Sequence, residues 1–216
     1  MRLLDLTSGN ILIDGIDIST LPRQETRSRV IALPQDSYLL AGSVRYNVDP
    51  LQACSDGAIE DALEKVELHH LVERKGGLDA TLTAEMLSHG QGQLLSLARA
   101  MLRKGCILVL DEATASVDVQ TDSLMQRLIR SEFSTHTIIA VAHRLDTIID
   151  FNAVAVMSRG NIIEYGPPKA LLKRDSAFKE LYQAQQGERR SWRESVLSQL
   201  TSVGLATMAS GAPLLP

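Results

Sequence analysis

The chain has 216 residues, of which 44% are hydrophobic and 22% are charged, and its formal net charge is −4. This length and composition are typical of one globular body with a sizeable core, and the mildly acidic balance gives no sign of the basic surface that nucleic acid would require. Two widely separated cysteines, Cys54 and Cys106, indicate neither a disulfide framework nor a zinc site and suit a reducing, cytosolic setting. No run approaches the roughly 18 consecutive apolar residues of a membrane span, and the N-terminus lacks the pattern of a secretory signal. We therefore expect no transmembrane segment in this chain.

The N-terminal part of the chain carries two strand patterns. Alternating β-branched residues on both sides of Asp14 and Gly15 predict a hairpin over 9–19. The apolar run SRVIALPQD, residues 28–36, is closed by a proline and a glutamine, and it predicts a strand that ends in a loop. Gln35 is therefore expected at a strand exit.

Helical periodicity dominates the middle of the chain. The spacing of apolar residues predicts amphipathic helices over about 55–71, 91–103 and 119–130. Apolar, β-branched runs at 107–110 and 136–143 flank the last of these helices and predict strands. Strand, helix and strand in this order predict a parallel crossover unit inside a sheet.

The C-terminal part begins with a second hairpin pattern. Residues 152–166 predict an antiparallel hairpin that turns at 159–161, and the prolines that follow predict a short helix near Lys169. A final helix is expected over 176–186. Residues 188–216 are rich in Ser, Ala and Gly without a sustained period, so we expect a weakly ordered tail.

Two adjacent carboxylates, Asp111 and Glu112, follow the apolar run 107–110. Ligands of open α/β sheets bind beyond the carboxyl ends of the parallel strands, which is where this pair is predicted to lie. In nucleoside triphosphate chemistry one acid of such a pair holds Mg²⁺ through its hydration shell and the next polarises the attacking water. Taken alone, the pair is explained equally well as the polar start of a loop that caps the next helix.

Other polar residues are predicted near this pair. His143 ends the next strand run and Gln35 ends another, so both are expected at the same sheet edge as Glu112. A lone histidine after an apolar strand is more often a hydrogen-bonded structural residue, so the neighbours of His143 carry its functional interpretation. The turn LSHGQ places backbone amides at a helix N-terminus, where an anion can bind, although a plain N-cap by Ser88 is the simpler interpretation of the turn alone.

In this order the motifs resemble those of the nucleotide-binding domain of ATP-binding cassette (ABC) transporters, over about residues 2–186. The Q-loop and the segment after it resemble LPQDSYLLAGSVRYNVDP, and the signature motif and its helix resemble LSHGQGQLLSLARAMLRK. The Walker B strand and D-loop resemble ILVLDEATASVD, and the switch-histidine segment resembles AVAHRL. The finer resemblance is to the second nucleotide-binding domain of subfamily C, the multidrug-resistance-associated full transporters, whose signature also lacks glycine at the place of His89. Gly92 is a departure, because the subfamily usually carries arginine there and a glycine inside a helix costs about 1 kcal/mol.

The resemblance implies an α/β fold with an ABC-type P-loop NTPase core, in which helices flank a mixed sheet, and a small α-helical subdomain. Residues 1–187 would form a partial nucleotide-binding domain, with the helical subdomain and signature region at about 43–100. The family's first strand and its GxxxxGK[ST] phosphate loop, Walker A, have no counterpart in this sequence. We therefore expect the C-terminal portion of a longer transporter, with marginal stability because leucines 3, 4 and 6 lack part of their packing.

The resemblance also implies roles for particular residues, with ATP and Mg²⁺ as the cofactors. The implied catalytic residues are Glu112, which polarises water, His143, which senses the γ-phosphate, and Gln35, which links metal or water to the membrane domain; Asp111 and Gln35 would hold the metal. Two such domains dimerise head to tail in the family. Contacts with the partner domain and with the ATP on its phosphate loop are implied for Ser88, Gly90, Gln91 and Asp118.

Three functions are compatible with these motifs. We favour an ATP-hydrolysing domain that drives transmembrane export at the cytoplasmic face of a membrane, with transmembrane domains and a second nucleotide-binding domain as partners; the isolated chain is expected to be inactive because Walker A is absent. The alternative is a non-catalytic dimerisation module that supplies its signature motif in trans. A DNA-repair or chromosome-organising ATPase is excluded, because that class inserts a long coiled coil and the short segment between Gln35 and Ser88 carries no heptad run.

Overall fold

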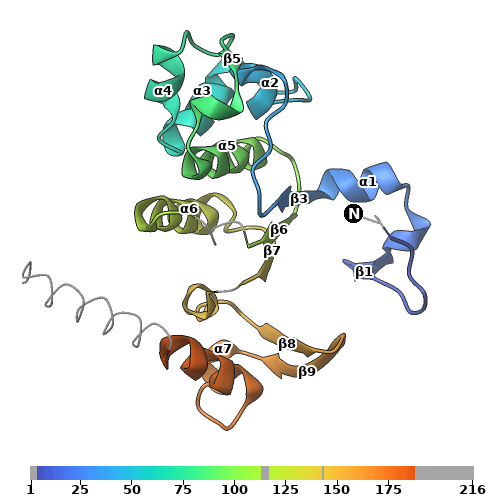
Figure 1. Ribbon diagram of the computed structural model, residues 1–216. Coiled ribbons are helices and arrows are strands. Elements are labelled where there is room, and N and C mark those ends of the chain that lie inside the picture. The colour runs from blue at the N-terminus through green and yellow to red at the C-terminus, as the bar shows by residue number, and fades with distance from the viewer. Residues whose placement is uncertain (1–3, 113–116, 143, 188–216) are drawn as a thin grey trace, which may run out of the picture. The chain divides into compact units, whose positions relative to one another are not determined.

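A computed structural model of the chain describes residues 4–112, 117–142 and 144–187. The chain forms two compact units, Met1–His143 and Arg144–Pro216 (Figure 1). The predicted tail at 188–216 lies outside the described residues.

The first unit begins with the predicted hairpin. Strands β1 (Leu12–Ile13) and β2 (Ile16–Asp17) pair antiparallel, and the φ angles of Asp14 and Gly15 are 51° and 78°. Two left-handed turn residues match the right-handed twist of hairpin strands, which confirms the hairpin prediction. The short 3₁₀ helix η1 (Ile18–Thr20) and helix α1 (Arg23–Arg29) follow. Helix α1 was not predicted, because its sequence RQETRSR has no apolar stripe.

A three-stranded parallel sheet forms the centre of this unit. Its strands are β3 (Val30–Leu33), β6 (Ile107–Asp111) and β7 (Thr137–Val141), in the order β3-β6-β7. Helix α6 (Val119–Glu132) connects β6 to β7 and confirms the predicted parallel crossover. Ile31, Leu33 and Leu108 are buried on one face of the sheet.

The other face of the sheet is open at β7. Ile139 and Val141 alternate with the inward residues of this edge strand, and 53% and 56% of their surfaces are exposed. Parallel sheets are usually covered on both faces, so these side chains are unusual for such a strand. Further exposed apolar side chains belong to the N-terminal segment and its hairpin: Leu4, Leu6, Leu12 and Ile16.

A group of helices follows β3, in which α2, α3 and α4 lie on one side of α5 (Figure 1). It comprises α2 (Val44–Val48), α3 (Asp56–Lys65), α4 (His69–Arg74) and α5 (His89–Met101), with the strand pair β4 (Gly42–Ser43) and β5 (Thr81–Leu82) and the 3₁₀ helix η2 (Ala84–Met86). The prediction of one continuous helix over 55–71 was wrong. Glu67 adopts a left-handed φ of 59°, which separates α3 from α4.

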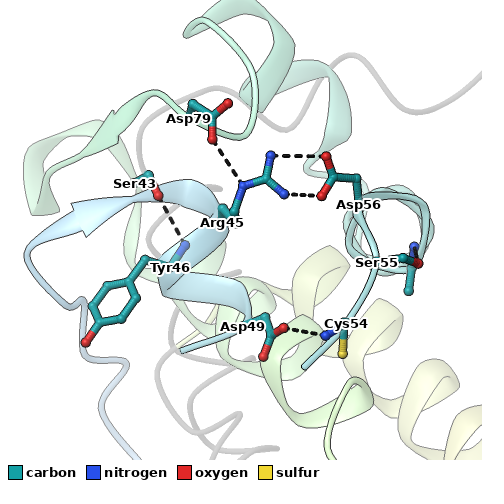
Figure 2. A network of polar contacts seen from close by, with 9 residues as sticks. Ser43, Arg45, Tyr46, Asp49, Cys54, Ser55, Asp56 and Asp79 are labelled. Atoms are coloured by element: carbon teal, nitrogen blue, oxygen red, sulfur yellow. Dashed lines mark hydrogen bonds and ion pairs between the residues drawn. The ribbon is translucent and has the colours of Figure 1, made fainter. Parts of the chain in front are cut away.

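A network of polar contacts ties these helices together (Figure 2). The guanidinium of Arg45, on α2, binds both carboxylate oxygens of Asp56 at the start of α3, and its Nε lies 3.1 Å from Oδ1 of Asp79. Asp56, followed by Asp79, raises the pKa of Arg45. The carboxylate of Asp49 accepts a hydrogen bond of 2.7 Å from the backbone N–H of Cys54. One arginine therefore links three segments that are distant in sequence.

The second unit is built on the other predicted hairpin. After the 3₁₀ helix η3 (Leu145–Ile148), strands β8 (Val154–Ser158) and β9 (Asn161–Gly166) pair antiparallel around Arg159 and Gly160, whose φ angles are positive. Helix α7 (Pro168–Leu171) and a helix over 177–187 complete the described part, as predicted. In the parts of both units that the structure describes, helices are either too short or too polar to span a bilayer.

Candidate functional site

Strands β3, β6 and β7 end at the same edge of the sheet. Leu33, Leu110 and Ala140 are paired in register across the three strands. Gln35 follows two residues after Leu33, while Asp111 is the last residue of β6. The chain positions of Gln35, Asp111 and Glu112 are thereby brought to one edge, as predicted. The predicted partner His143 follows β7 but lies outside the described residues.

The main chain at Glu112 has an unusual conformation. Its φ angle is 49°, in the left-handed region, where a residue other than glycine costs about 1 kcal/mol or more. Its N–H donates a hydrogen bond of 3.2 Å to the carbonyl of Val141 at the end of β7. The turn after β6 is therefore anchored to the neighbouring strand, and Asp111 is exposed while Glu112 is partly buried.

The signature-like turn forms the start of helix α5. The Ser88 hydroxyl oxygen accepts a hydrogen bond of 3.2 Å from the backbone N–H of Gln91, and Oε1 of Gln91 accepts one of 2.9 Å from the N–H of Ser88. This reciprocal capping box confirms the N-cap interpretation of Ser88. Because helix geometry leaves the first N–H groups without intrahelical acceptors, the N-terminus of α5 also retains donors for an anion.

The start of α5 packs against the start of α6 at Gly90. A Cβ atom at Gly90 would lie 3.2 Å from Oγ1 of Thr121 and 3.5 Å from Oδ2 of Asp118. Asp118 caps α6: its carboxylate accepts hydrogen bonds from the N–H groups of Gln120 and Thr121, both at 3.0 Å, and from the Thr121 hydroxyl at 2.7 Å. The hydroxyl of Thr121 and these amides lower the pKa of Asp118. The Asp118 carboxylate is thus bonded to its own helix.

A single carboxylate exposed at a strand end suits Mg²⁺. This ion keeps several waters and usually takes only one or two protein carboxylates together with phosphate oxygens. Asp111 offers such a ligand, and Glu112 lies beside it in the chain. The described residues contain no group of three His, Cys, Asp or Glu side chains that would form an all-protein metal site. Asp111 fits the single protein carboxylate that a hydrated, phosphate-linked Mg²⁺ can take.

A protein-family model described as "ABC transporter" matches residues 1–115. The chain belongs to the ABC transporter family. It is 51% identical over 194 residues to ABC transporter atnG of Emericella nidulans, and 46% identical over 183 residues to ATP-binding cassette sub-family C member 2 of Rattus norvegicus. These alignments cover 89% and 82% of this chain but only 12% of each relative. The match to the rat protein agrees with the resemblance to subfamily C.

A solved structure supports the family's fold for this chain. A bacterial Atm1-family ABC exporter with ATP bound superposes with a TM-score of 0.78 at 30% sequence identity. The superposition covers 86% of this chain and 33% of the exporter chain. The chain therefore has the α/β fold of an ABC nucleotide-binding domain, with the parallel sheet and the helical group described above.

Two further polar residues of the site region, Gln93 and Arg99, are absent from the predicted set. Both lie on the signature helix α5 and are almost completely buried, with 1% and 7% of their surfaces exposed. The sequence carried a signal for them, since each is a polar residue within the apolar run of a buried helix, and buried polar groups require hydrogen-bond partners. Their partners are carbonyl groups from segments distant in sequence, which periodicity alone does not reveal.

Proposed function

We propose that the chain is part of the ATP-binding and ATP-hydrolysing domain that drives transmembrane export in an ABC transporter. The domain comprises residues 1–187, with its helical subdomain and signature region at about 43–100. It works at the cytoplasmic face of a membrane, joined to transmembrane domains and to a second nucleotide-binding domain. The observation that carries the proposal is the common edge of β3, β6 and β7, where Gln35 follows β3 while Asp111 ends β6 and is followed by Glu112.

We assign the chemistry of nucleotide hydrolysis to this edge. Asp111, with Gln35, would hold Mg²⁺, Glu112 would polarise the attacking water, and His143 would contact the γ-phosphate. Phosphoryl transfer depends on positioning and on neutralising charge, so a metal-binding carboxylate beside a water-orienting carboxylate suits this reaction. The main-chain bond between Glu112 and Val141 supports the assignment, because it fixes the chain at the position of the second carboxylate.

We assign the N-terminus of α5 to ATP that is held by a partner domain. The capping box leaves the Ser88 hydroxyl proton available to an acceptor, because Oγ itself accepts from Gln91. Gly90 and Gln91 complete this contact, and Asp118 lies next to it at the start of α6. These 216 residues contain no GxxxxGK[ST] sequence, so we expect the chain alone to bind ATP weakly and to hydrolyse it negligibly.

Association with a partner tests the proposal. The chain is mixed with a subfamily C nucleotide-binding domain that has an intact phosphate loop, and complex formation is followed by sedimentation velocity with and without ATP and Mg²⁺. We expect ATP to induce association and Ser88→Arg to abolish it, because the arginine side chain blocks the approach to the α5 N-terminus. Ser55→Arg is the matched control: Ser55 caps α3 through the N–H of Ala58 and lies outside the proposed site. ATP-independent association, or association that survives Ser88→Arg, contradicts the proposal.

Turnover in the mixture separates the ATPase domain from the alternative, a non-catalytic module that supplies its signature motif in trans. For this test the phosphate-loop segment of a subfamily C domain is fused ahead of residue 1, because Glu112 would serve ATP held by the phosphate loop of its own chain. If the sheet edge takes part in hydrolysis, Glu112→Gln then lowers the rate of phosphate release. If only the signature motif acts, Ser88→Arg lowers that rate and Glu112→Gln leaves it unchanged. Turnover by the isolated chain that disappears on Glu112→Gln would contradict the expectation that the chain alone hydrolyses ATP negligibly.

A further inference from the structure

The segment Gln35–Leu40, which follows β3, is seated directly on the signature helix α5. Nε2 of Gln93 donates a hydrogen bond to the main-chain carbonyl of Gln35. One residue earlier on the helix, Gly92 leaves room for Ser37: a Cβ at Gly92 would lie 3.2 Å from the Cβ of Ser37 and closer still to its Oγ. The segment therefore packs against the helix because Gly92 has no side chain in its way and the Gln93 amide donates a hydrogen bond to it.

The same segment is held further along by Arg99 and Asn47. Nη2 of Arg99 lies 3.3 Å from the carbonyl oxygen of Tyr38, and its guanidinium carbon lies 4.7 Å from the centre of the Tyr38 ring. Nε of Arg99 donates to the carbonyl of Asn47 at 2.6 Å. The buried amide of Asn47 in turn pairs with both the N–H and the carbonyl of Leu40, each at 2.8 Å. Burial lowers the pKa of Arg99, and these carbonyls compensate the desolvated cation.

We infer that Gln93 is a positioning residue for Gln35. It attaches the main chain of the Q-loop segment Gln35–Leu40 to the signature helix α5, so that ligand binding at Ser88 moves or holds Gln35. The inference rests on the proposed function, in which Gln35 and Ser88 face nucleotide. Helix α5 is one continuous helix of 13 residues, and Gln93 lies in its second turn, close to the capping box. A displacement of the helix start is transmitted to Gln93 because packed helices move as rigid elements.

The chemistry of Gln93 argues against a purely space-filling role. Its Oε1 is buried and has no hydrogen-bond partner among the described residues. A buried acceptor without a partner is unfavourable, and an unbranched apolar side chain of similar size would fill the same space without it. Only the Nε2 donor explains a glutamine at this position, and that donor binds the Gln35 carbonyl.

Gln93→Met tests this inference in the full chain. Methionine retains the length of the side chain but removes both the donor and the unpaired acceptor. We expect amide hydrogen exchange in residues 34–40 to become roughly three- to tenfold faster, as expected for one lost hydrogen bond, while the Tm stays the same or rises. Gln126→Met is the matched control, because Gln126 is a partly buried glutamine on α6. Unchanged exchange in residues 34–40 overturns the inference, and Gln93→Leu replaces the methionine variant if that variant does not fold.

A second measurement uses the ATP-dependent complex with the partner domain. In the wild type, association should slow exchange both at 88–92 and at 34–40. In Gln93→Met it should slow exchange at 88–92 only, by the same factor as in the wild type. Equal slowing at 34–40 in both proteins overturns the coupling between the two segments. If the wild type forms no complex, the proposed function fails, whereas the exchange of the free chain still decides whether Gln93 holds the Q-loop.

Discussion

Replacing Gly92 by alanine measures how closely Ser37 packs on helix α5. Gly92 is buried inside the helix. A methyl group added there meets the Ser37 side chain, whose Oγ can rotate away but whose Cβ, 3.2 Å distant, is fixed by the main chain. The substitution therefore sets a gain in helix propensity against a steric conflict.

The two effects are of similar size and opposite sign. Alanine favours a helix interior over glycine by about 1 kcal/mol, while an extra methyl in a closely packed site costs about 1–3 kcal/mol. We expect Gly92→Ala to lower the free energy of unfolding by about 1 kcal/mol in the wild-type background. In a Ser37→Gly background the obstacle is gone, so the same change should raise it by about 1 kcal/mol. The expected coupling between the two positions is thus about 2 kcal/mol.

A double-mutant cycle in urea unfolding gives this coupling. Gly57→Ala is the matched control, because Gly57 lies in helix α3 and nothing lies within 4 Å of a Cβ placed there. It should be neutral or stabilising in both backgrounds, with no coupling to Ser37. If Gly92→Ala changes the free energy of unfolding equally in both backgrounds, Ser37 does not contact α5. The packing of the Q-loop segment Gln35–Leu40 on this helix would then be refuted as well.

Three further outcomes follow from the described contacts. Asp118→Ala should lower the Tm by a few degrees at neutral pH, because the start of α6 loses its cap. The pKa of Asp118 is lowered in the folded state, so the stabilisation by its carboxylate is present above the unfolded pKa of about 4 and is lost as the pH falls through the folded pKa. A Tm difference between wild type and Asp118→Ala that stays constant as the pH is lowered through this range would disprove the argument. Cys106 is exposed, whereas burial, followed by the charge of Asp49, raises the pKa of the partly buried Cys54 thiol. We therefore expect alkylation, followed by mass spectrometry, to modify Cys106 at least about tenfold faster than Cys54. Equal alkylation rates would contradict this difference between the two thiols. The double substitution Ile139→Lys with Val141→Thr should reduce self-association measured by light scattering, because the open edge of β7 exposes both apolar side chains. Thr137→Ser, on the same strand, is the control. Self-association that the double substitution leaves unchanged would exclude β7 as the contact surface.

Much of the site region is predictable because it depends on local chemistry. The Asp14-Gly15 turn requires two left-handed residues, Ser88 and Gln91 form a capping box three residues apart, and the runs before Gln35 and Asp111 are β-branched and apolar. Each of these features involves residues close in sequence, so composition and spacing suffice to predict it. The positions of Asp111 and Glu112 at the sheet edge then follow from the parallel crossover.

Other features depend on contacts between segments that are far apart in the chain. The left-handed Glu67 that separates α3 from α4 has no distinctive residue pattern. Helix α1 lacks an apolar stripe. The partners of Gln93 and Arg99 lie more than fifty residues away from them. Local patterns in this chain specify which residues begin and end its strands and helices, because backbone conformation responds to near neighbours. The packing of the Q-loop segment on the signature helix arises only in the folded chain, where buried polar side chains form hydrogen bonds with carbonyl groups that are distant in sequence.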